Sequence, residues 1–138
     1  MCAQAYIRFI APFRAFGNPK NAAGFFRPAY DFRNGRRPAP GWLRDAIAEE
    51  IAWFCDYLPV PHRFGVVTRK SQRRYAGICW FRDDAHETLR HAYNLAALVE
   101  IGDVPVTRVI AYNPGNIVYR DAQQVVAIPR KDAPITFH

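Results

Sequence analysis

Apolar residues recur at helical spacing in two segments of the chain. From Trp42 to Tyr57 they line one face of a predicted helix, which Pro59 ends. A second helix is predicted to start at the Asp84–Glu87 segment, whose carboxylates suit a capped first turn, and to close at Gly102. The buried stripe contains Leu43, Ile47, Ile51, Phe54 and Leu58 in the first helix, and Ala85, Leu89, Ala92, Ala96 and Val99 in the second.

Other segments are rich in β-branched and aromatic residues, which predicts strands. The central structural inference is a hairpin, in which Phe64–Arg69 and Tyr75–Arg82 are joined by a basic connection. A first strand is predicted over Tyr6–Ala11 and is stopped by Pro12, and residues 22–32 form one short helix broken at Pro28. The remaining predicted strands are Val104–Tyr112, Ile117–Tyr119 and Gln124–Ile128.

The predicted order of elements defines the fold class. It is β-α-β-β-α-β with an extra C-terminal β-hairpin, which is the ferredoxin-like split βαβ sandwich. This is an α+β fold, with the helices on one face of a mainly antiparallel sheet. A length of 138 residues suits one domain, so we expect residues 1–138 to form a single α+β domain with an irregular tail at residues 129–138.

Composition narrows the class of protein. Half of the residues are hydrophobic and 14% are aromatic, which is incompatible with a disordered chain. Because no apolar run approaches the roughly 20 residues that span a bilayer and no signal peptide is evident, we expect no membrane contact and a cytoplasmic location. The three cysteines are widely spaced and lack a CxxC pair, which indicates reduced thiols rather than disulfides or a zinc site.

The chain is strongly basic, with a formal net charge of +7. Of its 19 cationic residues only Lys20, Lys70 and Lys131 are lysines. Arginine suits the recognition of phosphates and carboxylates, so the bias favours a polyanionic or acidic partner. A GC-rich genome that encodes arginine in place of lysine would explain the same bias, and both interpretations stay open.

Two basic loops concentrate this charge, one near residue 35 and one in the predicted hairpin. We predict that their arginines contact phosphates or an acidic surface while aromatic rings of a sheet stack on bases. A solvated basic hairpin with its aromatics in the core is the alternative. The predicted binding residues are Arg33, Arg36, Arg37, Arg69, Lys70, Arg73, Arg74 and Tyr75.

The hairpin also invites comparison with the RNA recognition motif. Residues 73–80 match its third-strand consensus in part, but Arg74 stands in place of the glycine and Gly77 in place of the central stacking aromatic. Tyr75 and Trp80 are five residues apart and would lie on opposite faces of a regular strand. We therefore assign no membership of that family.

A second set of residues could carry enzyme chemistry. An imidazole could activate a thiol in the group Cys79, Asp83, Asp84, His86 and His91. Cys79, however, is expected to face the core. Glu87 and His91 have the i, i+4 spacing of metal ligands, although an ordinary surface ion pair is favoured. No catalytic residue, metal or cofactor is predicted, because the common nucleotide-binding and hydrolase motifs are absent.

Several short stretches look similar to recurrent segments of a family of small uncharacterised bacterial proteins of about this length. The resemblance spans nearly the whole chain and implies a bacterial protein, with no activity or cofactor attached. The stretches are Tyr6–Phe9, Leu58–Phe64, Cys79–Phe81, Pro114–Asp121 and Gln124–Pro129.

Three classes of function follow from these observations. The first hypothesis is a non-enzymatic basic module that binds nucleic acid or another acidic surface. The second is a protein-binding regulator or inhibitor, in which exposed Trp42 and Tyr57 beside arginines form a hot spot. The third is a small enzyme centred on Cys79 and His86.

Overall fold

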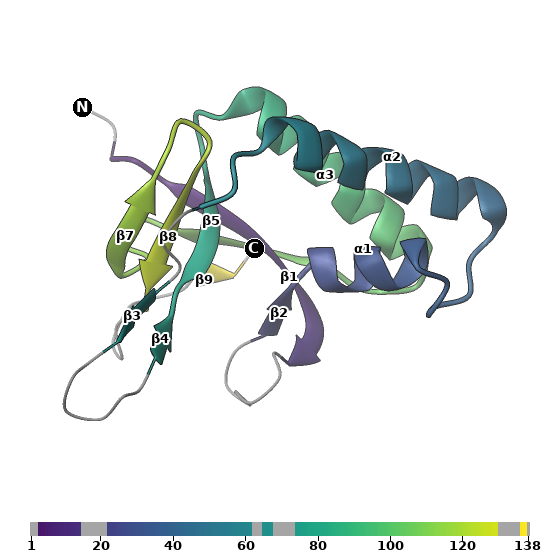
Figure 1. Ribbon diagram of the computed structural model, residues 1–138, viewed down its shortest axis with the longest axis horizontal. Helices are drawn as coiled ribbons and strands as arrows, with labels where there is room; N and C mark the ends of the chain where they lie inside the picture. The colour runs from purple at the N-terminus through teal and green to yellow at the C-terminus, as the bar shows by residue number, and fades with distance from the viewer. Residues whose placement is uncertain (1–2, 15–21, 62–64, 68–73, 130–135, 138) are drawn as a thin grey trace. The chain divides into compact units, whose positions relative to one another are not determined.

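The computed structural model describes residues 3–14, 22–61, 65–67, 74–129 and 136–137. Its described part is an α+β structure with an antiparallel sheet and the helices α1 (Phe26–Arg33), α2 (Gly41–Tyr57) and α3 (His86–Ile101) (Figure 1). The chain divides into two compact units. Unit 1 comprises residues 1–8, 59–86 and 109–138, and unit 2 comprises residues 9–58 and 87–108. None of the helices in the described ranges is both long and apolar enough to cross a membrane.

Unit 2 contains the helices, and hydrophobic periodicity predicted two of them well. α2 spans Gly41–Tyr57 and α3 spans His86–Ile101, of which His86 belongs to unit 1. The expected apolar stripes are buried: Leu43, Ile47 and Ile51 of α2 are almost fully excluded from solvent. The stripe of α3 includes buried Leu89, Ala92, Ala96 and Val99.

The segment before α2 differs from the prediction of one broken helix. Residues Ala22–Gly24 form strand β2, and Phe26–Arg33 form helix α1. Pro28 is the third residue of α1. An amide in the first helical turn has no acceptor inside the helix, so a proline there removes no hydrogen bond. Pro28 is therefore buried in an intact helix instead of breaking it.

Strand β1 spans Tyr6–Arg14, so the prediction that Pro12 ends it is wrong. Its second half pairs with β2, and the register of this pair shifts between Ile10 and Arg14. Proline has no amide hydrogen to donate and is tolerated in a strand where the ladder is irregular. The irregular register around Pro12 lets the strand continue.

Aromatic side chains pack against one another in unit 2. The Phe9 and Phe25 ring centroids lie 5.1 Å apart, those of Phe25 and Phe26 4.7 Å, and those of Phe26 and Phe54 5.0 Å. These tilted and edge-to-face pairs join β1, α1 and α2. Such pairs add to the hydrophobic stabilisation that their buried area supplies.

Unit 1 is built on strand β5 (Ile78–Arg82), which pairs antiparallel with β8 (Gln124–Ile128). β7 (Asn116–Arg120) pairs with the other edge of β8. Val125, Val126 and Ala127 of β8 are completely buried, so neither face of this strand is open to water. The apolar centre of β8 is therefore the core of this part of the sheet.

The predicted hairpin is present. β3 (Gly65–Val67) pairs antiparallel with β4 (Arg74–Ala76), with Val66 opposite Tyr75. The second predicted strand is divided, since Gly77 separates β4 from β5. β3 and β4 form a two-stranded sheet of their own.

The ferredoxin-like strand order is not confirmed. The large sheet has the order β7-β8-β5-β1-β6-β9, with β2 also paired to β1. β6 is Thr107–Ala111, and β9 (Thr136–Phe137) is a strand that the sequence pattern does not predict. In the large sheet β1 lies between β6 and β5, as the ferredoxin-like fold requires. That fold places its second strand on the other side of β5, but here β8 pairs with that side of β5. That both helices cover one face, and that residues 1–138 are one domain, stay predictions.

Candidate functional site

The clearest arginine-rich surface in the described residues lies at the end of α1. The amide of Gly35 donates to the carbonyl of Phe32 at 3.2 Å, and the amide of Arg36 donates to the carbonyl of Asp31 at 2.8 Å. Gly35 has a positive φ of 76°. This is a Schellman motif, in which a left-handed glycine closes the helix. It sets the direction in which Arg36 and Arg37 leave α1.

The side chains of this segment, which we call the arginine cap (Arg33, Arg36 and Arg37), contact rings as well as solvent. The guanidinium carbon of Arg33 lies 4.5 Å from the ring centroid of Tyr30, and that of Arg37 lies 5.9 Å from the ring of Phe32. Arg33 also donates from Nε to the Asn34 side chain at 3.3 Å. These contacts orient two of the three guanidinium groups.

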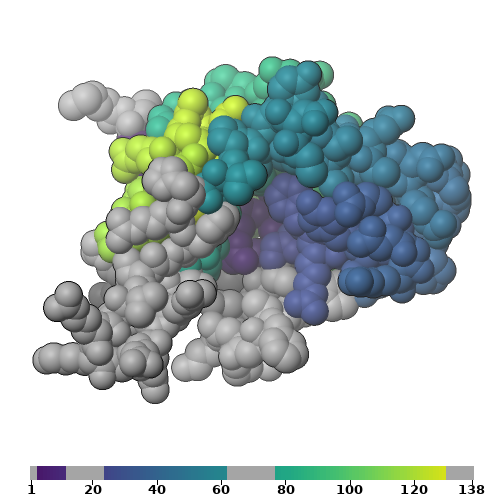
Figure 2. All heavy atoms as spheres, viewed as in Figure 1, coloured from purple at the N-terminus to yellow at the C-terminus, as the bar shows by residue number. Residues whose placement is uncertain are grey.

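Tyr30 is exposed, so its ring borders the arginine cap at the surface. Partial burial, and to a lesser extent the hydrogen-bonded Cys55, raises the pKa of the Tyr30 phenol. The phenol is consequently neutral at physiological pH and adds no negative charge beside Arg33. Figure 2 shows α1 and α2, coloured blue to teal, on the molecular surface.

The remaining predicted binding residues belong to the hairpin in unit 1. Arg69, Lys70 and Arg73 lie outside the described residues. Arg74 and Tyr75 are part of β4, where the backbone pairing with Val67 and Val66 is described. The arginine cap is in unit 2. The prediction that both basic loops act together therefore stays a prediction.

Two members of the hypothetical Cys-His group, Cys79 and His91, differ from the expectation. Cys79 is exposed, so the expectation that it faces the core is wrong. Desolvation by the surrounding protein raises the pKa of the Cys79 thiol, Asp121 raises it further, and Arg8 opposes the shift. A thiol held protonated in this way is a poor nucleophile. His91 belongs to unit 2 and is paired with a different residue, as described below.

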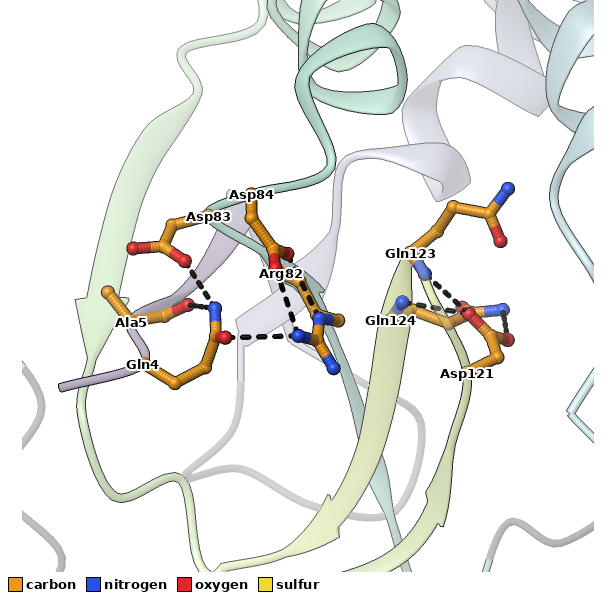
Figure 3. Close-up of polar contacts among 8 residues, drawn as sticks. All are labelled: Gln4, Ala5, Arg82, Asp83, Asp84, Asp121, Gln123 and Gln124. Carbon is orange, nitrogen blue, oxygen red and sulfur yellow. Dashed lines mark hydrogen bonds and ion pairs between the residues drawn. The ribbon is translucent and has the colours of Figure 1, made fainter. Parts of the chain in front are cut away.

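Asp84 also has a different role from the predicted helix cap. Its carboxylate accepts hydrogen bonds from Nε and a terminal nitrogen of Arg82, both at 3.0 Å (Figure 3). This bond lowers the pKa of the Asp84 carboxyl and raises the pKa of Arg82. Arg82 donates in addition to Gln4, and the amide of Gln4 donates to Asp83. The four side chains form a surface network.

A second network in unit 1 organises the turn before β8. Asp121 accepts from the amides of Gln123 at 2.8 Å and Gln124 at 3.0 Å (Figure 3). The buried Gln124 side chain donates to the carbonyl of Pro59 at 2.5 Å and to Asp121 at 3.2 Å. The Tyr119 hydroxyl donates to Asp121, which raises the pKa of the phenol. All of these groups are satisfied internally, which indicates a structural role.

Unit 2 also contains a polar cluster that sequence reasoning missed. Nδ1 of His91 lies 2.7 Å from Oε2 of Glu50, and Asn94 donates to Oε1 of Glu50 at 3.0 Å. The His91 ring stacks on Trp53, with centroids 3.8 Å apart and planes 13° apart. An ionised carboxylate can only accept, so Nδ1 donates to Glu50. The cluster joins α2 to α3.

This pairing also corrects the hypothetical metal ligands. Glu87 forms an ion pair with Arg90 at 3.7 Å, whereas His91 is bonded to Glu50. Within the described ranges, no three His, Cys, Asp or Glu residues are grouped so that they could hold a metal ion. The i, i+4 spacing alone could not have identified Glu50, which is 41 residues before His91.

Comparisons with protein-family models, with curated proteins and with solved structures found no match to this chain. The resemblance to small bacterial proteins thus stays a prediction, as does the ferredoxin-like interpretation of the fold.

Proposed function

We propose that the protein binds nucleic acid, and that the arginine cap with the ring of Tyr30 is one contact surface. The observation that carries the proposal is the guanidinium of Arg33 above an exposed tyrosine ring, with Arg36 and Arg37 beside it on an ordered helix end. Arginines neutralise phosphates, and an exposed ring or guanidinium plane offers a stacking surface for a base.

Local charge supports this proposal. From residue 27 to residue 37 the chain carries four arginines and one aspartate. Arg36 is extended into solvent, with its side chain 75% exposed and its ion pair with Asp31 at the long distance of 3.8 Å. An exposed pair of this kind is worth little, so Arg36 can exchange Asp31 for a phosphate at small cost.

The order of the arginine cap before any ligand binds also supports the nucleic-acid proposal. The Schellman hydrogen bonds hold the backbone of the cap, and the ring contacts hold Arg33 and Arg37. Side chains that are already ordered lose less conformational entropy on binding. A single-stranded ligand is the better fit, because its bases are available for stacking.

The test is a fluorescence-anisotropy titration of the protein with labelled single-stranded RNA, single-stranded DNA and duplex DNA at several salt concentrations. We expect salt-dependent binding, strongest for a single strand. Arg36→Gln should reduce the slope of log K against log salt by about 0.7 and weaken binding about fivefold near 0.1 M salt.

Arg90→Gln is the matched control for Arg36→Gln. Arg90 is 73% exposed and pairs with Glu87 at 3.7 Å, so the variant removes the same charge from a nearly identical environment on α3. We expect it to bind as the wild type does. Binding that is insensitive to salt, or an equal loss in both variants, would contradict the proposal.

A further inference from the structure

The outer face of α2 differs in charge from the rest of the protein. Residues 41–57 carry four carboxylates and one arginine, a formal charge of −3 within a chain of +7. Asp45, Glu49 and Asp56 are exposed and recur at helical spacing, so they share one stripe. In the described structure no ion pair or hydrogen bond occupies these three carboxylates.

Aromatic rings lie at both ends of this stripe. Trp42 is 60% exposed and Tyr57 is 62% exposed. Trp53, half-buried, continues the surface, with its ring centroid 5.3 Å from that of Tyr57. Large exposed rings that no core requires are typical of interaction surfaces, and Trp and Tyr are enriched at their hot spots. We call this surface the α2 face (Trp42, Asp45, Glu49, Trp53, Asp56 and Tyr57).

We propose that the α2 face binds a basic polypeptide segment of another protein, whose lysines or arginines pair with the carboxylates and lie against the rings. The charge of the stripe determines the sign of the partner. The second hypothesis placed arginines beside Trp42 and Tyr57, and on α2 the residues between these rings include one arginine and four carboxylates. A cation placed over Trp42 or Tyr57 gains a cation-π contact, which favours basic partners again.

The dimensions of the face fit a short segment. Trp42 and Tyr57 lie about 22 Å apart along the helix axis, at 1.5 Å per residue. A helix of about four turns or an extended strand of about seven residues spans this length. The stripe spacing of Asp45, Glu49 and Asp56 suits a partner helix with basic residues at the same i, i+4 and i+11 positions.

Self-association through α2 is disfavoured by the same charges. An antiparallel pair of α2 helices that brings Trp42 of one copy to Tyr57 of the other places Glu49 opposite Glu50 of the other copy, one residue from its own counterpart. A parallel pair places every carboxylate against itself. Like charges at such an interface are repulsive, so a second α2 helix is the wrong occupant.

The experiment uses the full chain and two labelled helical peptides. One is an amidated 15-residue peptide of alanine, leucine and lysine, and the other has glutamate in place of each lysine. We expect the lysine peptide to bind at low salt and the glutamate peptide not to bind. Trp42→Ala should weaken binding of the lysine peptide about tenfold or more. Glu49→Gln should weaken it about two- to fivefold.

Each variant has a matched control. Tyr112→Ala removes another exposed aromatic residue, and Glu100→Gln removes an exposed carboxylate from α3. Both should bind within about twofold of the wild type, and so should Arg36→Gln, which tests the nucleic-acid proposal separately. Trp42 and Glu49 are exposed, so their variants should unfold at the wild-type temperature.

Three results would overturn the inference. The first is failure of the lysine peptide to bind, and the second is an equal loss of binding in the control variants. The third is self-association in sedimentation velocity that Trp42→Ala abolishes, because that result assigns the α2 face to a second copy of the chain.

Discussion

The contact of Gly102 with Phe32 provides a stringent test of packing in unit 2. Gly102 follows the last residue of α3, and its amide bonds to the carbonyl of Leu98. A Cβ atom built on Gly102 would lie 2.4 Å from Cζ of Phe32, with both Cε atoms within 3.0 Å. Phe32 is completely buried, so a shift of its ring takes place inside the packed core.

We expect Gly102→Ala to lower the free energy of unfolding by about 2 kcal/mol, because one added methyl group must displace a buried ring. Ordinary carbon contacts begin near 3.5 Å, so the ring has to move by roughly 1 Å. The measurement is urea unfolding followed by tryptophan fluorescence and circular dichroism, with the shift in midpoint converted through the common m-value.

Two further variants separate this overpacking from a general effect of replacing glycine. Gly41→Ala adds a methyl group that meets nothing within 4 Å and should change stability by less than about 1 kcal/mol. Phe32→Leu replaces the opposing ring by a smaller side chain. The double variant Phe32→Leu with Gly102→Ala should therefore be about 1 kcal/mol more stable than the sum of the two single effects predicts. A Gly102→Ala protein as stable as the wild type, or strict additivity with Phe32→Leu, would refute the packing argument.

Two predictions concern ionisable groups. Glu50→Ala should lower the free energy of unfolding, measured in urea, by about 1–3 kcal/mol because it leaves the ring of His91 without its acceptor. The control Glu49→Ala, at an exposed neighbouring position, should lower it by under about 0.5 kcal/mol. Equal losses in the two variants would show that the His91 pair is not stabilising. The hydrogen bond from Arg82 lowers the pKa of Asp84 in the folded protein. The pair therefore stabilises the fold at a pH above about 3.9, the pKa of an aspartate in the unfolded chain. This stabilisation is lost as the pH falls through the lower pKa of Asp84 in the folded protein. In Arg82→Gln the pKa of Asp84 from an NMR titration should rise toward its ordinary value, and an unchanged pKa would exclude Arg82 as the cause.

The sequence predicted those elements whose stabilising residues are close together in the chain. The apolar stripe of α2 has a period that only a helix satisfies, and Pro59 marks its end. The hairpin of β3 and β4 likewise joins neighbouring segments. Pro12 and Pro28 misled the prediction because the effect of a proline depends on whether its missing amide would have had an acceptor.

The candidate site was predictable only in part for the same reason. Clustering of arginines in the sequence identified Arg33, Arg36 and Arg37, and the glycine between them indicated a turn. The partner of His91 could not be identified, because Glu50 is 41 residues away on another helix. The acidic stripe of α2 is visible in the sequence once the helix is assigned, and Trp42 and Tyr57 are exposed in the structure, as the second hypothesis expected.

The sequence alone determined the chemistry available to this protein: a cationic chain with an amphipathic helix, an arginine-rich turn and a short hairpin. These features depend on local periodicity and on turn residues. Tertiary structure decided that β8 lies beside β5, that Gln124 bonds to the carbonyl of Pro59 and that Glu50 holds His91. For each of these contacts the chain contains many other residues of the same type that could be the partner. The folded geometry, which brings distant segments together, decides which of them forms the contact.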